Sequence, residues 1–358
     1  MSEMTADVLV IGGGTAGFGA AVAAGRQDLD VVLLEAGSKV GGVMAFCPGM
    51  PWGAAYPDDT SIGGLMEELA LRLYDMTPLM AEKRPSTLEN FGAEIIYDHD
   101  VAITTMFDML QEAGVRVHLG GIAHEPIMIG NTIGKVQFHD RHGPHEITAK
   151  IVIDCSGDGD ISAKAGVPIE LGDAKGSMMG VTLSFMMENA DWDQVFAGDD
   201  PYFTQYAAKG IAQRRLHEDL AKLYLMKGFH KDTVFCNSVV IRNVDGTDPQ
   251  AVSRATQEGR RRAVQMATFL RSDIPGFAKA HMTHLGPTVG VRETRKLQVE
   301  KITQKTGVRF TSTSPLKGKR KLSSNFGKKL KVSTMNLPYN SEDCTEARGR
   351  YWLRTGLC

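Results

Sequence analysis

Three glycines near the start of the chain have the spacing of a dinucleotide phosphate cradle. Gly12, Gly14 and Gly17 follow the apolar run 8–11, which has the character of a strand buried on both faces. In such a cradle the first glycine allows a tight turn, the second lets the backbone approach a pyrophosphate, and the third lets a helix pack against the strand. The expected chemistry is phosphate binding by backbone amides, with the candidate residues Gly12, Gly13, Gly14, Thr15, Ala16 and Gly17.

A carboxylate stands where the ribose of a dinucleotide would be bound. A second apolar run, 31–34, ends at Glu35, about 20 residues after the cradle begins, as dinucleotide-binding units require. A helix expected from Thr15 to Gly25 would direct its unpaired amides and the positive end of its dipole at the phosphates. Glycine spacing alone is weak evidence in a chain with 39 glycines, but strand, turn, helix, strand and acid together predict a dinucleotide site.

Two further segments could approach the same ligand. The pair Gly41 and Gly42 has no side chains to obstruct a close approach. Ser156, Gly157 and Asp158 follow a strand expected to end at residue 153, so they form a second turn with acids at its rim. This turn could cap a helix at 161–166 and also contact a ribose or phosphate, and a capping turn alone is the alternative.

Two arginines three residues apart, Arg292 and Arg295, lie beside glycine-containing turns. They could face an anionic ligand, and the beginning of a surface helix is the alternative. No histidine or cysteine group indicates a metal site, because the histidines at 139, 142 and 145 fall on a polar hairpin tip with no fourth ligand. We therefore predict no metal.

The pattern of strands and helices predicts an α/β fold with a Rossmann-like, three-layer domain built on a parallel sheet. This domain takes up 1–166 and 286–300, with a loop and helix excursion at 51–97. A loop region is expected at 48–64, across the beginning of that excursion. Residues 167–285 are expected to form an inserted mixed α/β domain. We expect it to contain strands at 181–186 and 234–241, a helical segment over 202–227, and a helix after Asp248-Pro249 whose arginines, Arg262 included, stay in solvent.

The end of the chain differs in charge from the rest. Of 358 residues, 42% are hydrophobic and the net charge is −2, but 301–358 holds 13 Lys and Arg against 3 Asp and Glu. The stretch 301–341 contains no acid and only scattered apolar residues, so we expect a basic, disordered or aberrant tail. A second interpretation is that this tail binds nucleic acid or an anionic surface.

The blocks described above resemble the FAD-dependent oxidoreductases that have the glutathione-reductase-type FAD-binding fold. Within them the chain is most similar to the subgroup related to the A subunit of heterodisulfide reductase, over about residues 6–300. The likeness rests on separated blocks in the same order, namely 12–17 with Glu35, Gly41-Gly42, the turn 154–158, and the segments 244–249 and 290–295.

This resemblance implies bound FAD, with Glu35 on the adenosine ribose, the amides of residues 12–17 on the pyrophosphate, and Gly41-Gly42 near the flavin. It also implies transfer of a hydride or electrons between a small-molecule substrate and an acceptor, neither of which the sequence identifies. Arg292 and Arg295 are the candidates for stabilising the anionic reduced ring. Some relatives carry iron–sulfur clusters, but no ligand set for one is legible here.

The resemblance fails after the block at 290–295. Relatives continue into a strand and a glycine-rich helix start that close over the flavin, whereas residues 340–358 do not match this segment. We therefore expect a truncated or frame-shifted C-terminus and weak retention of FAD.

Two other enzyme classes share the cradle. An NAD-dependent dehydrogenase would use Glu35 equally well, and it is the alternative to an FAD enzyme. Disulfide reductases of this fold need a second nucleotide cradle and a cysteine pair, which the sequence does not show, so we expect Cys47 to serve ordinary packing. With no signal-like segment at residues 1–7 and no long apolar run, we expect a cytoplasmic location; the oligomeric state is not predicted.

Overall fold

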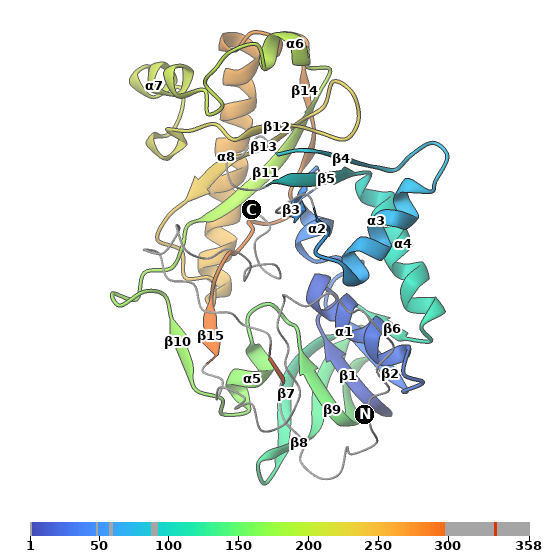
Figure 1. The fold of residues 1–358 in the computed structure, drawn as a ribbon. Coiled ribbons are helices and arrows are strands. Elements are labelled where there is room, and N and C mark those ends of the chain that lie inside the picture. The colour runs from blue at the N-terminus through green and yellow to red at the C-terminus, as the bar shows by residue number, and fades with distance from the viewer. Residues whose placement is uncertain (1, 48, 57–59, 87–91, 298–332, 335–358) are drawn as a thin grey trace.

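The computed structural model describes residues 2–47, 49–56, 60–86, 92–297 and 333–334. Two sheets lie at opposite ends of the molecule, and a third, smaller sheet lies beside them with two helices (Figure 1). The pieces of chain that join these sheets come together in the middle, where the candidate site lies.

The main sheet contains both parallel and antiparallel pairs. Its strands, in spatial order, are β6 (Arg116–Leu119), β2 (Val31–Glu35), β1 (Ser2–Ile11), β9 (Gly143–Asp154), β8 (Thr132–Asp140) and β7 (Ile122–Ile129). Pairs among the first four strands are parallel, as predicted, whereas β8 and β7 add an antiparallel extension. The sequence indicated β8 and β9 but not β7.

The apolar runs of β1 and β2 are buried because both faces of this sheet are covered. Val8, Val10 and Leu33 pack with α1 (Thr15–Gly25) and α4 (His99–Glu112), while Leu9 and Val32 belong to a second core on the opposite face. That second core includes side chains of β8 and of α5 (Asp160–Lys164). The two cores confirm the expected three-layer arrangement around a largely parallel sheet.

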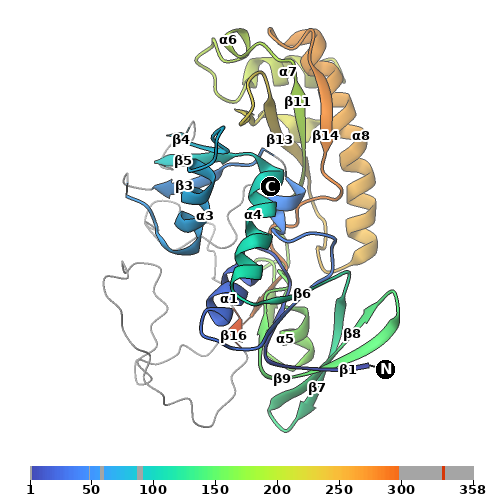
Figure 2. The same cartoon turned by 90° about the vertical axis from the view of Figure 1, so that its right-hand side faces the viewer.

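The excursion after β2 contains a small antiparallel sheet. Its elements in chain order are α2 (Val43–Phe46), β3 (Trp52–Tyr56), α3 (Gly64–Tyr74), β4 (Ala81–Pro85) and β5 (Ala93–Tyr97). The prediction of an uninterrupted loop at 48–64 is therefore wrong, because Trp52 and Tyr56 pair with β5. Proline and glycine at 48–53 obscured this short strand, which tertiary pairing stabilises. Helices α3 and α4 lie side by side next to this sheet (Figure 2).

The second large sheet is antiparallel and packs against one long helix. Its elements are β11 (Val181–Glu188), α6 (Trp192–Val195), α7 (Thr204–Ala212), η1 (Glu218–Leu220), β12 (Leu225–Lys227), β13 (Val234–Ile241), α8 (Pro249–Asp273) and β14 (His281–Leu285), and the strand order is β12-β13-β11-β14. Helix α8 begins as predicted, because the Asp248 carboxylate accepts a hydrogen bond from the Gln250 amide and proline follows Asp248.

Two predictions for the part of the chain that forms the second large sheet and α8 are wrong. The segment 202–227 is not one helix: α7 ends at Ala212, and Leu216, Leu220 and Leu223 are buried in an irregular strap that leads to β12. Arg262 is not in solvent, because it is only 8% exposed and its guanidinium donates to Asp219, Glu258 and the Val240 carbonyl. Tertiary packing overrides the helical pattern in both places.

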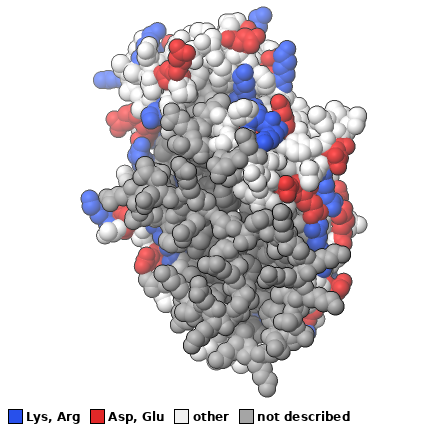
Figure 3. Space-filling view, viewed as in Figure 1, with Lys and Arg blue, Asp and Glu red and all other residues white. Residues whose placement is uncertain are grey.

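The chain returns to the first half through residues 286–297. Gly290 forms a bridge with Thr182 at the beginning of β11, and β15 (Arg295–Leu297) pairs with β10 (Ile169–Leu171). The predicted basic tail, 301–358, lies outside the described residues except for β16 (Ser333–Thr334), which pairs with β9. Figure 3 shows that lysines, arginines and acids are interspersed on the described part of one face of the molecule. Of the helices in the described part of the chain, none combines the length and apolar composition that a membrane crossing requires.

Candidate functional site

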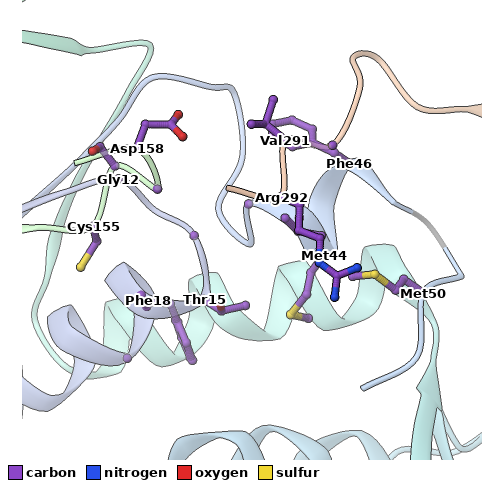
Figure 4. A pocket seen from close by; sticks show the side chains of 18 of the residues that line it. Gly12, Thr15, Phe18, Met44, Phe46, Met50, Cys155, Asp158, Val291 and Arg292 are labelled. Atoms are coloured by element: carbon purple, nitrogen blue, oxygen red, sulfur yellow. The ribbon is translucent and has the colours of Figure 1, made fainter. Parts of the chain in front are cut away.

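A cavity of about 740 Å³ opens where the first turn of the main sheet faces the excursion and the returning segment. This volume is within the range of about 300–1,000 Å³ that ligand sites occupy. One end is formed by the glycine turn after β1 and the turn after β9, and the other by Met44, Met50 and Arg292 (Figure 4). The lining side chains of β3, α3 and α4 extend this second end, since β3 follows Met50 in the chain and α4 contacts both α2 and α3. We call these the cradle end and the chamber end.

The glycines at the cradle end differ in whether the fold requires them. Gly12 has φ +95°, and a Cβ there would lie 2.4 Å from the Cys155 carbonyl oxygen. A Cβ on Gly17 would lie 1.7 Å from the Gly12 carbonyl oxygen, so only glycine lets α1 pack this close to the turn. Gly14 is different, since its φ of −64° is ordinary and the only nearby atom is Gly42 Cα, 3.8 Å from the position of a Cβ. The fold does not require a glycine at position 14. The absence of a side chain there instead keeps the adjacent part of the cavity open.

The first turn of α1 presents free donors to that space. The first hydrogen bond of the helix runs from the Phe18 amide to the Gly14 carbonyl oxygen, so the amides of Thr15, Ala16 and Gly17 have no partner within the helix. Unpaired amides and the positive end of the helix dipole favour an anion at this point.

Glu35 lies beside the cradle and holds its backbone. One carboxylate oxygen accepts from the Gly13 amide at 2.5 Å, and the other accepts from the Gly37 amide at 2.6 Å. A carboxylate offers about four acceptor positions. Two of them therefore remain for a ligand at the edge of the cavity that Glu35 lines.

The Gly41-Gly42 pair is pinned to the cradle. The Gly41 amide donates to the Gly13 carbonyl oxygen at 2.8 Å, and a Cβ on Gly42 would lie 2.9 Å from Gly14 Cα. Both residues have positive φ, +109° and +54°. Gly42 lines the cavity, and α2 begins directly after it and carries Met44 into the chamber end.

The second turn is organised by a residue that the sequence analysis did not single out. Asp154 is 6% exposed, and its carboxylate accepts from the amide and hydroxyl of Ser156 and from the amide and hydroxyl of Ser162. It thereby satisfies the beginning of α5, a task that the prediction gave to residues 156–158. The sequence did contain a signal for this role, because Asp154 ends a buried strand and stands two residues before Ser156-Gly157.

Cys155 in the same turn is chemically quiet. Burial of its thiol, with a smaller contribution from the charge of Asp154, raises the pKa of Cys155 to about 12. The side chain is therefore a neutral thiol at physiological pH. Cys47, expected to serve only packing, is buried beside Met50 and Phe235 and is disulfide-bonded.

The two candidate arginines have different environments. Arg295 donates to the Asp160 carboxylate at 2.6 Å and to the Asp158 carbonyl oxygen at 3.2 Å, and it does not line the cavity. Arg292 lines the cavity, where its side chain points past Met44 toward Met50 (Figure 4). The segment between them is not a helix, and Thr294 donates from its hydroxyl to the Asp158 carboxylate at 2.7 Å.

Most of the predicted site residues meet at one cavity. Those that line it are Gly12, Gly14, Thr15, Ala16, Glu35, Gly42, Ser156, Gly157, Asp158 and Arg292, whereas Gly13, Gly17, Gly41 and Arg295 lie behind its surface. The sequence analysis missed the chamber end, including Met44, Phe46, Met50, Trp52, Met66 and Met106. Only the position of Met44 and Phe46, two and four residues after Gly42, could have indicated them.

The family model described as "FAD dependent oxidoreductase" matches residues 7–313. The chain belongs to this family of FAD-dependent oxidoreductases. FAD is therefore the cofactor, and the family match favours FAD over NAD, the alternative considered for the same cradle. The open space at Gly14, beside the free amides of α1, fits a dinucleotide pyrophosphate.

Solved structures of flavoproteins have a similar fold. A geranylgeranyl bacteriochlorophyll reductase-like protein from Thermoplasma acidophilum has a TM-score of 0.52 at 15% identity, covering 81% of this chain and 66% of that one. The p-nitrophenol 4-monooxygenase from Pseudomonas putida has a TM-score of 0.50 at 15% identity, covering 83% and 70%. Aklavinone-11 hydroxylase, solved with FAD and aklavinone, has a TM-score of 0.51 at 14% identity, covering 84% and 56%.

These similarities extend to the fold alone, because the sequence identities are low. This chain spans about half to two thirds of the length of the reductase-like protein and of aklavinone-11 hydroxylase. A comparison with curated protein sequences found no match.

Proposed function

We propose that this FAD-dependent oxidoreductase transfers a hydride or electrons between a small-molecule substrate and a separate acceptor. FAD would lie along the cavity with its pyrophosphate at Gly12 to Gly17 and its isoalloxazine toward the chamber end. The observation that carries this proposal is Gly14, an ordinary backbone position whose missing side chain leaves open space at the beginning of α1.

The cradle end would bind the polar half of FAD. The amides of Thr15 and Ala16 are unpaired within α1 and line the cavity, so they are the proposed donors to the pyrophosphate. Glu35 would accept hydrogen bonds from the adenosine ribose while it holds the turn through Gly13 and Gly37.

The second turn would close this half of the site. Ser156, Gly157 and Asp158 line the cavity, and the hydrogen bonds of Ser156 to Asp154 fix the direction of the turn. We propose that Gly157, at which a Cβ would meet no atom within 4 Å, allows the ligand to pass close to the backbone.

When bound, FAD supplies the two-electron chemistry, and the protein sets orientation and charge. The apolar side chains of the chamber end would exclude water from the reacting face. Arg292 is the proposed cation for negative charge on the reduced ring. Arg295 would act as a positioning residue, because it ties the returning segment to the 158–160 turn.

The absorbance spectrum of the purified protein tests the proposal. We expect an oxidised flavin band that is weak in the protein as purified and grows when FAD is added, consistent with the weak retention expected from the sequence. After heat denaturation we expect FAD, not FMN, in the supernatant, because the cradle end is built for the adenosine half. A protein that has no flavin band and does not bind added FAD in a titration would contradict the proposed function.

Three other expectations stay predictions. Membership of the subgroup related to the A subunit of heterodisulfide reductase is a finer assignment than the family match, and a cytoplasmic location rests on sequence alone. Nucleic-acid binding by the basic tail concerns residues outside the described part of the chain. Retention on DNA that disappears with salt, and also on removal of 301–358, would support that alternative.

A further inference from the structure

The chamber end is lined by unusually adaptable apolar side chains. They come from α2, β3, α3 and α4, from residues 49–51 before β3 and from residues 60–63 before α3, so six separate pieces of chain contribute. The lining comprises Val43, Met44, Phe46, Met50, Trp52, Ile62, Leu65, Met66, Leu69 and Met106. Methionine is flexible and polarisable, and it is common where a surface must accommodate apolar groups of variable shape.

Arg292 is the cation of this apolar chamber. Among the described residues that line the cavity it is the only lysine or arginine, and in this part of the chain its guanidinium has no hydrogen bond or ion pair. Figure 4 shows it between the side chains of Met44 and Met50. Arg295, three residues later, is held by Asp160 and by the Asp158 carbonyl oxygen.

No acid of the cavity is positioned to neutralise Arg292. The acids that line it in the described structure are Glu35, Asp154 and Asp158, and all three belong to the cradle end. Each already accepts hydrogen bonds, from the Gly13 and Gly37 amides, from Ser156 and Ser162, and from Thr294.

A ligand that fills the chamber removes water from this guanidinium. Losing that hydration without a partner is costly for a charged group, so a ligand with its own anion is favoured over a neutral one of the same shape. The phosphates of FAD are expected at the opposite end, and the oxidised flavin ring carries no charge. Since no acid in the described part of the chain meets Arg292, the substrate is the source of the anion that we consider for the oxidised enzyme.

We infer that the substrate is an amphipathic small molecule whose apolar body lies in the methionine-rich chamber and whose acidic group binds Arg292. This inference deepens the proposed function and rests on it. The reduced flavin is a second source of negative charge for the same arginine, and the two sources are separable because only one of them exists in the oxidised holoenzyme.

The test uses the FAD-loaded, oxidised protein and two matched probes, octanoate and octanol, with binding followed by the shift of the flavin absorption band and by calorimetry. We expect octanoate to bind roughly 10- to 100-fold more tightly than octanol, the range for a charge-assisted hydrogen bond. Affinity should rise roughly three- to fourfold for each methylene from hexanoate to decanoate.

Variants of Arg292 locate the anion. Arg292→Met keeps an unbranched apolar side chain and should bring octanoate down to the affinity of octanol, whereas Arg292→Lys should retain part of the preference because the charge remains. Arg271→Met is the matched control, since Arg271 is exposed on α8 and does not line the cavity. It should leave both affinities unchanged.

The outcomes separate this inference from the proposed function. A flavin band with equal binding of octanoate and octanol, or with octanoate binding unchanged in Arg292→Met, overturns the amphipathic anion and leaves the FAD assignment intact. If Arg292→Met does not fold, the wild-type comparison and Arg292→Lys decide. A protein that has no flavin band and also does not bind added FAD would overturn the proposed function itself.

Discussion

The two ends of the cavity are built in different ways. At the cradle end the ligand-facing groups are backbone amides and carboxylates from two turns, and each acid there already has a partner within the protein. At the chamber end the wall consists of side chains from six segments, and in the described structure its one cation has no partner. A region that is complete before the ligand arrives suits an invariant cofactor, whereas an adaptable region with an open charge suits selection of a substrate.

Among the substitutions that test this difference between the two ends, one at Gly14 should have the largest effect on FAD affinity. We expect Gly14→Val to fold, since φ is −64° and the adjacent space is open, but to lose FAD binding by more than about 3 kcal/mol, or about a hundredfold, because the side chain displaces the pyrophosphate from several amides. Fluorescence titration with FAD measures the affinity, and thermal unfolding of the apo-protein measures the fold.

Gly17→Ala is the matched variant for Gly14→Val. A Cβ at Gly17 would clash with the Gly12 carbonyl oxygen, so this variant should lose stability before it loses affinity. If Gly14→Val binds FAD like the parent protein, the cradle end is misassigned.

Glu35→Gln should have the next largest effect. The charge and one acceptor are lost, and the new amide group faces the Gly13 or the Gly37 amide, so affinity for FAD should fall by about 1–3 kcal/mol. Because Glu35 also holds the turn, denaturant unfolding of the apo-protein should show a loss of similar size. Glu188→Gln, at an exposed position of β11, is the control, and an unchanged dissociation constant in Glu35→Gln would place the ribose elsewhere.

The arginine pair tests the chamber end. If Arg292 stabilises negative charge on the reduced ring, Arg292→Met should lower the two-electron reduction potential by roughly 30 mV, which corresponds to about 1.4 kcal/mol. Arg295→Met should leave the potential unchanged and instead reduce stability by about 1 kcal/mol, because it removes the contacts to Asp160 and Asp158. Equal shifts of potential in both variants would contradict the assignment of different roles.

The smallest expected effect concerns His99, which begins α4 and lies beside the Ala45 backbone of α2. Burial lowers the pKa of His99 below 6.5, so below about pH 6.5 the unfolded chain binds more protons than the folded protein. The free energy of unfolding should therefore fall as the pH drops from about 6.5 toward the folded pKa.

Replacing His99 should make that pH dependence shallower. Urea unfolding of His99→Gln between pH 7.5 and pH 5 measures the slope, with His281→Gln as the control at an exposed position. His124, whose pKa is also lowered chiefly by burial, keeps part of the slope in both variants. A slope in His99→Gln as steep as that of the parent protein would show that the proton is taken up elsewhere.

The sequence alone determined the cradle end, because its geometry is local. The strand, the glycine spacing and Glu35 lie within a single β-α-β unit, in which Gly12 and Gly17 are required for steric reasons and Glu35 accepts hydrogen bonds from the turn. Helix α8 could be predicted for the same reason, since Asp248-Pro249 and a regular apolar repeat define it locally.

Only the tertiary structure decided the chamber end and the roles of the two arginines. Met44, Trp52, Met66 and Met106 come from different elements, and an apolar side chain in any of them is indistinguishable in sequence from ordinary core. Arg292 and Arg295 have the same charge and neighbouring positions, yet one faces the cavity and the other meets Asp160. Long-range packing brings these segments together. A local sequence pattern does not specify which distant residue each side chain will contact.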